Sequence, residues 1–342
     1  MKVLITGPIL GYNRGREKSQ AEFLIDLLSK KGLDIVWASK YPNRVKRAVD
    51  IYRTIVKNKD AMLGIVMVYS YGAFFYADMA SYLLKSAGIP VIFWLHGGAL
   101  PEFTDRKTKW VIRVLKRAAL LVAPSLYLAS YYRKFGLDVK VIPNIVFSER
   151  YPYHGEDHIE PRLLWMRTFH PLYNPKMAIL AFKEILKEIP DATLTMAGVD
   201  RGIMNEVIDL SKKLGLSDRI IFPGFLDEKG KYNAFKSNYI YLHTNNVDNT
   251  PVSVIEALTS GLIVIATDTG GIPYLLTHGK NALLVKPNDY SKMARYVVDI
   301  VKGNINYKNL RKNGKELAME SDGKKIVNKW LSIIESVNRK DV

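Results

Sequence analysis

Short apolar runs alternate along the chain with longer stretches in which apolar residues recur at helical spacing. The apolar runs are typical of buried strands, and they cover residues 2–6, 34–38, 62–70, 90–95, 120–123, 139–142, 162–166, 193–197, 220–223, 239–242 and 282–285. Helical stretches follow most of them, for example residues 19–30, 76–86 and 175–189. This alternation of strand and helix predicts an α/β protein with parallel sheets wound on both faces.

The length of the chain predicts two such domains. A chain of 342 residues exceeds what one hydrophobic core usually serves. The polar stretch 148–161 is rich in Pro, His and acidic residues, which favours an interdomain linker there. We therefore expect a first domain over residues 1–150 and a second domain over residues 158–320.

One strand, loop and helix stands out between residues 239 and 261. The apolar run 239–242 ends in a polar loop that leads into a helix beginning near Pro251 and ending near Gly261. Proline suits a first helical turn, and glycine suits the left-handed residue that ends a helix. The positive end of this helix is expected to face whatever binds at the carboxyl end of the strand.

Two acidic residues lie in this segment, Asp248 in the loop and Glu256 in the helix, with seven residues between them. Carboxylates accept hydrogen bonds that sugar hydroxyls donate, so the pair suits a polyol ligand. The backbone at the helix start would assist them, through residues Asn249, Thr250, Pro251 and Val252. The alternative is that Asp248 caps the helix and Glu256 is a solvated helix residue.

The amino-acid composition excludes several kinds of functional site. The chain has no cysteine, which excludes disulfides, thiolate metal sites and thiol catalysis. We see no paired acids of the Asp-x-Asp type that would hold a metal, and we expect none. No signal peptide or membrane-spanning stretch is recognisable, so a cytoplasmic protein is expected, with peripheral contact to the inner face of the cell membrane as a further option.

The net charge of +17 calls for an anionic partner or a dispersed Lys-rich surface of a heat-adapted protein. No nucleic-acid-binding motif is present, and we expect no nucleic-acid partner. Two basic helical stretches, residues 43–59 and 106–117, could lie on an anionic bilayer. The alternative for each is an ordinary surface helix whose apolar side faces the core.

The longest pattern is DNTPVSVIEALTSGLIVIATDTGGIPYLL at residues 248–276, followed by GKNALLVKPND at 279–289. It resembles the retaining glycosyltransferases of family 4, and the segment 139–144, VKVIPN, resembles the end of that family's first domain. The resemblance implies the GT-B fold, with two Rossmann-like domains facing a cleft. It implies that the second domain binds a nucleotide-diphosphate sugar such as a UDP- or GDP-sugar, without metal or cofactor. The first domain would bind a glycan or lipid-linked acceptor, and a final helix within 321–342 would return to it.

The resemblance also assigns roles. Glu256 would hold the ribose, Asp248 and the backbone of residues 249–252 would contact the sugar, and Gly224 with Phe225 would lie at the base. The residues near the reacting groups would be His96, which follows a strand, and the diphosphate-binding cations Arg167 and Lys176. Gly15 stands in the first glycine loop, where the family usually has a Gly-Gly pair.

The chain departs from the family pattern at several places. Asp248 replaces a glutamate, Met166 replaces a glycine, Tyr274 stands where the family often has glutamate, and the spacing from Arg167 to Lys176 is longer than usual. These departures leave two alternatives to a glycosyltransferase: a non-catalytic subunit with the same fold, and a sugar-nucleotide epimerase.

Overall fold

The computed structural model describes residues 1–13, 18–155 and 158–338, and it divides the chain into two compact units. Unit 1 comprises Met1–Ile145 together with the C-terminal segment from Gly323, and unit 2 comprises Val146–Asp322. Each unit contains a six-stranded sheet in which neighbouring strands pair in parallel. The predicted α/β class with two doubly wound parallel sheets is confirmed.

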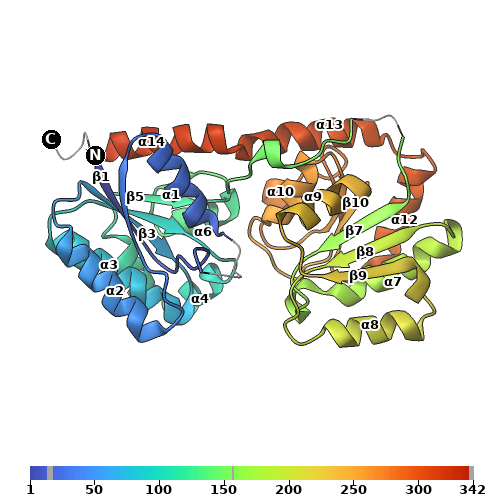
Figure 1. The fold of residues 1–342 in the computed structure, drawn as a ribbon, viewed down its shortest axis with the longest axis horizontal. Helices are drawn as coiled ribbons and strands as arrows, with labels where there is room; N and C mark the ends of the chain where they lie inside the picture. The colour runs from blue at the N-terminus through green and yellow to red at the C-terminus, as the bar shows by residue number, and fades with distance from the viewer. Residues whose placement is uncertain (14–17, 156–157, 339–342) are drawn as a thin grey trace. The chain divides into compact units, whose positions relative to one another are not determined.

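In unit 1 the strand order is β2-β1-β3-β4-β5-β6 (Figure 1). The strands are β1 Lys2–Thr6, β2 Asp34–Ala38, β3 Leu63–Val68, β4 Val91–Leu95, β5 Leu120–Ala123 and β6 Val139–Val141. The helices are α1 Gln20–Lys30, α2 Arg44–Lys57, α3 Phe74–Ser86, α4 Leu100–Arg106, α5 Thr108–Leu115, α6 Leu126–Arg133 and α14 Gly323–Asn338. One apolar core joins the buried sides of α2, α3, α5 and α6 to the sheet.

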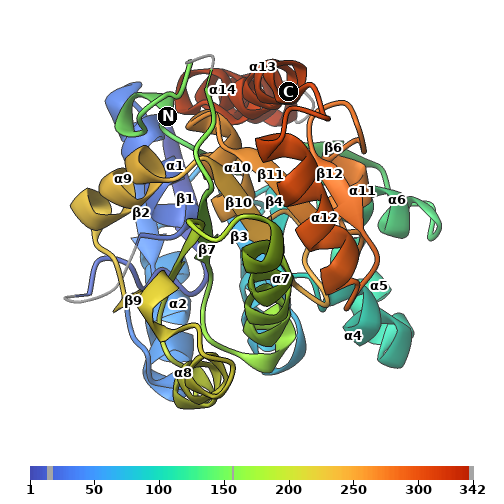
Figure 2. The ribbon, with the colours of Figure 1, turned by 90° about the vertical axis from the view of Figure 1, so that its right-hand side faces the viewer.

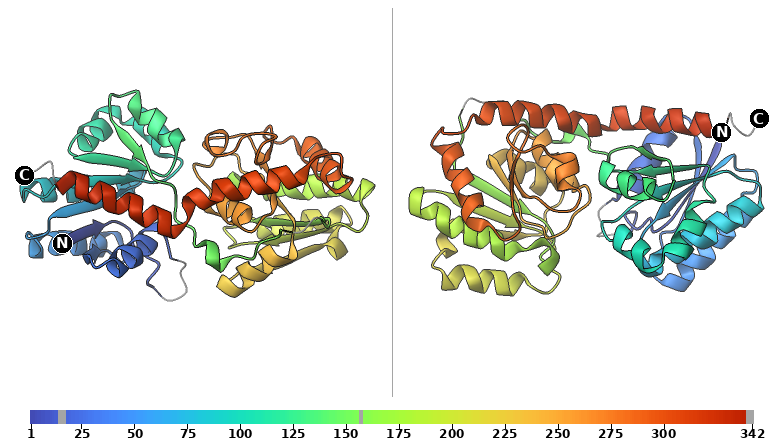
Figure 3. Two further views of the ribbon diagram at one scale, coloured as in Figure 1. Left: turned by 90° about the horizontal axis from the view of Figure 1, so that it is seen from above. Right: turned by 180° about the vertical axis from the view of Figure 1, so that it is seen from behind.

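The C-terminal helix α14 is part of unit 1, where it lies beside that unit's sheet (Figure 3). Its Trp330 is fully buried and meets Trp94 of β4 edge to face, with ring centroids 5.0 Å apart. Aromatic pairs of this geometry add to the stability gained from burial. The last helix therefore completes the core of the unit that the first residues begin.

In unit 2 the strand order is β12-β11-β10-β7-β8-β9 (Figure 2). The strands are β7 Arg162–Met166, β8 Thr193–Ala197, β9 Ile220–Gly224, β10 Ile240–His243, β11 Ile263–Thr267 and β12 Leu283–Val285. The helices are α7 Pro175–Glu188, α8 Met204–Lys213, α9 Glu228–Ser237, α10 Val252–Thr259, α11 Ile272–Leu275, α12 Tyr290–Val301 and α13 Tyr307–Ala318. Short 3₁₀ turns include η3 at Pro171–Tyr173.

The chain builds this second sheet outward in two directions. From β7 it proceeds to β8 and β9 on one side, and from β10 to β11 and β12 on the other. The order therefore reverses between β7 and β10. Loops diverge at such a point, and ligands of open parallel sheets bind there, beyond the carboxyl ends of the strands.

The two units divide between Ile145 and Val146, so the polar stretch that we expected to be a linker, residues 148–161, is assigned to unit 2. The Val146 amide donates to the Ser321 carbonyl over 2.8 Å, and the His154 amide donates to the Ser260 carbonyl over 2.9 Å. These two hydrogen bonds attach the chain just before the segment, and the segment itself at His154, to the rest of unit 2.

The helix expected at 106–117 is α5, Thr108–Leu115, and it is shorter at both ends. Lys107 has φ −136° and ψ 37°, which ends α4 and precedes α5. Helix α9 was not anticipated, because the sequence EKGKYNAFKS buries only Ala234 and Phe235. Among the described residues, no helix is both long enough and apolar enough to cross a membrane.

Candidate functional site

The chain reversal in unit 2 brings together residues that follow two neighbouring strands. Arg167 comes directly after β7, and Asp248 lies in the loop that follows β10. These two strands are neighbours in the sheet (Figure 2). Arg167 Nη2 donates to Asp248 Oδ2 over 2.8 Å. Both side chains are mostly buried, with 19% and 12% of their surfaces exposed. Two residues 81 positions apart thus form one charged centre.

Several neutral groups hold this ion pair in place. The Asn245 side-chain amide donates to Asp248 Oδ2 over 2.5 Å, and the Asn249 backbone amide donates to Oδ1 over 2.8 Å. On the other partner, the Arg167 guanidinium lies over the Tyr173 ring, 4.3 Å from its centroid. Burial raises the pKa of Asp248, while the Arg167 charge and the Asn249 and Asn245 hydrogen bonds oppose that rise.

Two fully buried residues of this centre escaped the sequence reasoning: His243 and Asn245. His243 ends β10, and its Nε2 lies 3.8 Å from Asp248 Oδ2. Burial, aided by the Arg167 charge, lowers the pKa of His243 well below its usual value, so the imidazole is neutral at pH 7. The signal that could have revealed both was a run of polar residues directly after a buried strand.

Glycines allow the loops around the ion pair to touch. A Cβ on Gly271 would lie 1.8 Å from the Asn249 carbonyl oxygen, and one on Gly270 would lie 2.2 Å from that of Asp248. A Cβ on Gly198 would lie 1.8 Å from the Arg167 carbonyl oxygen. No side chain fits at such distances, so the loops after β8 and β11 require glycine to pack against the loops that carry Arg167 and Asp248.

The second acid, Glu256, lies within α10 and is 7% exposed. Its Oε1 accepts a hydrogen bond from the Tyr151 hydroxyl over 2.6 Å. Pro251, not Asp248, is the N-cap of α10. The structure therefore excludes the alternative in which Asp248 caps the helix and Glu256 is solvated. Because Pro251 has no N–H and the Asn249 amide already donates to Asp248, the expected amide donors reduce to Thr250 and Val252.

The other expected donor-site residues of unit 2 are more dispersed. Gly224 ends β9 with φ +74°, and its carbonyl accepts from the Gly198 amide over 2.8 Å. Phe225 follows and is half exposed. Lys176 is at the start of α7, but its ammonium pairs with exposed Glu206 over 2.7 Å. The structure does not bring Lys176 to the Arg167–Asp248 pair. Gly15 lies outside the described residues.

His96 belongs to unit 1, directly after β4. It is buried, its ring stacks on Tyr69 with centroids 5.3 Å apart, and it contacts Trp94 at 4.4 Å. Its Nε2 has no hydrogen-bond partner among the described residues. Burial lowers the pKa of His96 to about 3, so this imidazole is also neutral at pH 7.

Within the described part of the chain, no cluster of three or more His, Asp or Glu side chains is placed to hold a metal ion.

Two family profiles together match most of the chain. The profile described as glycosyl transferases group 1 matches residues 152–317, and the profile described as glycosyltransferase family 4 matches residues 12–150. Relatives include the N-acetyl-alpha-D-glucosaminyl L-malate synthase of Bacillus anthracis, 25% identical over 55% of this chain and 49% of the relative. An uncharacterised glycosyltransferase of Methanocaldococcus jannaschii is 28% identical over 60% of each chain. The chain thus spans about half the length of these curated relatives.

Solved structures show the same fold. Anabaena HepE in complex with UDP and glucose superposes with a TM-score of 0.76 at 17% identity, covering 98% of this chain and 100% of that chain. Sucrose-phosphate synthase from Thermosynechococcus elongatus also gives 0.76, at 14% identity and with 98% and 99% covered. With both halves matched by family profiles and the whole fold by GT-B structures, the chain belongs to the family 4 glycosyltransferases.

Proposed function

We propose that this protein transfers a sugar from a nucleotide-diphosphate sugar to an acceptor, with retention of the anomeric configuration. The observation that carries the proposal is the Arg167–Asp248 pair, which is mostly buried at the chain reversal between β7 and β10. It offers a cation for phosphate and a carboxylate for sugar hydroxyls within one hydrogen bond of each other. Membership of the family and the UDP bound to Anabaena HepE support a nucleotide-sugar donor.

In this proposal different residues of unit 2 bind different parts of the donor. Arg167 stabilises the negative charge that develops on the leaving diphosphate, which is the main requirement of such a transfer. Asp248 accepts hydrogen bonds from the sugar, and Glu256 accepts them from the ribose. The amides of Thr250 and Val252 face the ligand at the positive end of α10, while the Asn249 amide holds Asp248. Lys176 would have to leave Glu206 to reach the diphosphate.

His96 of unit 1 is proposed to act on the acceptor side. Because its imidazole is neutral at pH 7, it can accept or donate a hydrogen bond but brings no charge. The acceptor itself is proposed to be a glycan or a lipid-linked molecule.

We also propose that the protein contacts the inner face of an anionic membrane through helix α2. On α2 the predicted apolar residues do not face the core, which takes Ile51 and Ile55 instead. An exposed stripe runs along this helix, with exposed fractions between 40% and 72%, and consists of Val45, Val49, Tyr52 and Val56. The cations around it are Arg44, Lys46, Arg53 and Lys57. Apolar residues flanked by cations are typical of helices that lie in a bilayer interface.

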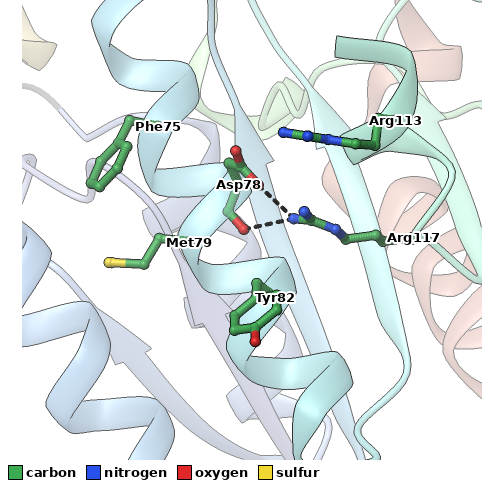
Figure 4. Close-up of a pocket in the computed structure, with 6 residues that line it drawn as sticks. All are labelled: Phe75, Asp78, Met79, Tyr82, Arg113 and Arg117. Atoms are coloured by element: carbon green, nitrogen blue, oxygen red, sulfur yellow. Dashed lines mark hydrogen bonds and ion pairs between the residues drawn. The ribbon is translucent and has the colours of Figure 1, made fainter. Parts of the chain in front are cut away.

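The neighbouring helix α3 adds exposed Phe75 and Tyr82 beside a surface pocket of about 480 Å³ (Figure 4). Arg117 is held there by Asp78 over 2.5 Å, whereas Arg113 extends exposed at the rim. In contrast, the apolar side of α5 is buried. Of the two stretches predicted to lie on a bilayer, residues 43–59 supply the apolar contact and residues 106–117 supply only cations.

The donor is tested by a thermal-shift screen of the protein against UDP, GDP, ADP and their common sugar conjugates, without added metal. A ligand at a hundred times its Kd should stabilise the protein by about 2.7 kcal/mol. A hit identifies the donor base. A blank across the panel would contradict the transferase and favour the non-catalytic subunit, while a changed sugar nucleotide formed without acceptor would indicate an epimerase.

Loss of either acid should reduce catalysis. We expect Asp248→Ala and Glu256→Ala each to lower kcat/KM at least about a hundredfold, because each removes an oriented charged contact to the donor. Glu228→Ala is the matched control, since this carboxylate of unit 2 is 86% exposed. Rates near those of the wild type in both site variants would refute the assignment.

The depressed pKa of His96 predicts an acid-sensitive fold. The unfolded state binds a proton near pH 6.5 and the folded state only near pH 3, so stability is present above pH 6.5 and is lost as the pH falls. Between pH 7 and pH 5, His96 should cost about 2 kcal/mol of unfolding free energy. Urea unfolding at pH 7 and pH 5 measures this loss in the wild type and in His96→Phe, and the variant should lose less unfolding free energy than the wild type. The control His158→Asn changes an exposed side chain and should lose as much as the wild type. Parallel losses in wild type and His96→Phe would contradict a buried neutral imidazole.

The membrane proposal predicts binding to vesicles that contain phosphatidylserine and not to vesicles of phosphatidylcholine alone, with the binding weakened by salt. Val45→Ser combined with Val49→Ser should weaken it at least about tenfold, since two exposed apolar side chains no longer enter the interface. Val199→Ser, at an exposed valine of unit 2, is the control. Equal binding to both kinds of vesicle, or an unaffected double variant, would count against this surface.

A further inference from the structure

The carboxylate of Glu256 has a partner that lies far away in the sequence. The Tyr151 hydroxyl donates to its Oε1 over 2.6 Å, across 105 residues. We propose that Tyr151 is a positioning residue that orients Glu256 for the ribose of the bound nucleotide. This inference rests on the proposed function, and it adds a specificity-determining side chain outside the segment 248–256.

Tyr151 is itself fixed by contacts within unit 2. The Ser148 hydroxyl, three residues earlier, donates to Asp322 Oδ2 over 2.6 Å, and the Tyr151 amide donates to the Ser148 carbonyl over 3.3 Å. The Tyr151 ring meets the Phe235 ring edge to face, with centroids 5.5 Å apart. The hydroxyl therefore approaches Glu256 from one direction, on a backbone and a ring that are both held.

The chemistry of the pair favours a permanent hydrogen bond. Burial, and then the negative charge of Glu256, raise the pKa of Tyr151 far above its usual value, so the hydroxyl keeps its proton. A hydroxyl that donates to a carboxylate forms one of the stronger hydrogen bonds in proteins. The proton therefore stays on Tyr151, which remains the donor in this hydrogen bond.

The consequence for Glu256 is a defined direction. The last torsion of a glutamate side chain is broad, so an unheld carboxylate samples many orientations. With Oε1 engaged by Tyr151, that torsion is set and Oε2 points one way. A carboxylate has more acceptor sites than one hydroxyl can fill, so capacity remains for the ribose. Recognition of a hydroxyl by a buried, oriented acceptor is what makes a site reject analogues that lack it.

The test uses the nucleoside diphosphate, UDP, GDP or ADP, that binds in the thermal-shift screen, together with its 2′-deoxy and 3′-deoxy counterparts. Affinities are measured by titration calorimetry for the wild type and for Tyr151→Phe, which keeps the ring and removes the donor. We expect the variant to bind the ribonucleotide about tenfold more weakly and to lose its preference for that ribonucleotide over at least one deoxy form.

The matched control is Tyr239→Phe, which removes a hydroxyl bonded to the Glu160 carboxylate over 3.2 Å. Tyr239 directly precedes β10, and the site follows the other end of that strand. This variant should retain both the affinity and the preference of the wild type. A similar loss in both variants would show a general effect of removing a buried hydroxyl and would overturn the proposal.

A double-mutant cycle with Glu256→Gln separates positioning from stability. If Tyr151 acts through the carboxylate, then Tyr151→Phe should change affinity less than twofold when Glu256 is already Gln. Equal effects in both backgrounds would overturn the proposal, and so would an undiminished ribose preference in Tyr151→Phe. If the wild type binds a nucleotide and Tyr151→Phe keeps the wild-type preference for the ribonucleotide, the inference fails while the proposed function stands. If the wild type binds none of the three, both fail.

Discussion

The ion pair between Arg167 and Asp248 is the interaction on which the site depends. Removing two opposite charges from water costs free energy, and their attraction repays it only when geometry and further hydrogen bonds are good. Here Asn245, the Asn249 amide and the Tyr173 ring supply those further contacts. A ligand phosphate would meet a guanidinium already oriented toward the ligand side of the sheet, so little reorganisation would be needed on binding.

The pair exists because of the order of the strands. Residues 167 and 248 are far apart in sequence, and they meet because β7 and β10 are neighbours at the point where the chain reverses. Close packing of the loops then fixes their approach, and this is the reason for glycine at 198, 270 and 271. A side chain at any of these positions would push apart the loops that carry the charges.

The carboxylates of Asp248 and Glu256 are held by different kinds of contact, and they are proposed to bind different parts of the donor, the sugar and the ribose. Asp248 is held by a cation and by an amide from its own loop, whereas Glu256 is held by a tyrosine from another part of the chain. The replacement of the family's glutamate by Asp248 shortens that side chain by one methylene, and in this structure the shorter carboxylate lies against Arg167. Its proposed contact with the sugar therefore depends on Asn245 and Asn249 keeping it in place.

The sequence by itself determined the α/β class, nearly all of the strands, and the acids Asp248 and Glu256, because these follow from local periodicity and from one continuous motif. Sequence reasoning placed Arg167 by resemblance and missed Tyr151, His243 and Asn245. Only the tertiary structure decided which distant residues meet, since strand order is set by packing of the whole sheet. The same limit applied to α2 and α5: both read as basic helices with an apolar side, but the apolar stripe faces solvent on α2 and the core on α5. Helical spacing shows that residues share a side, and only the neighbours of the helix determine which side is buried.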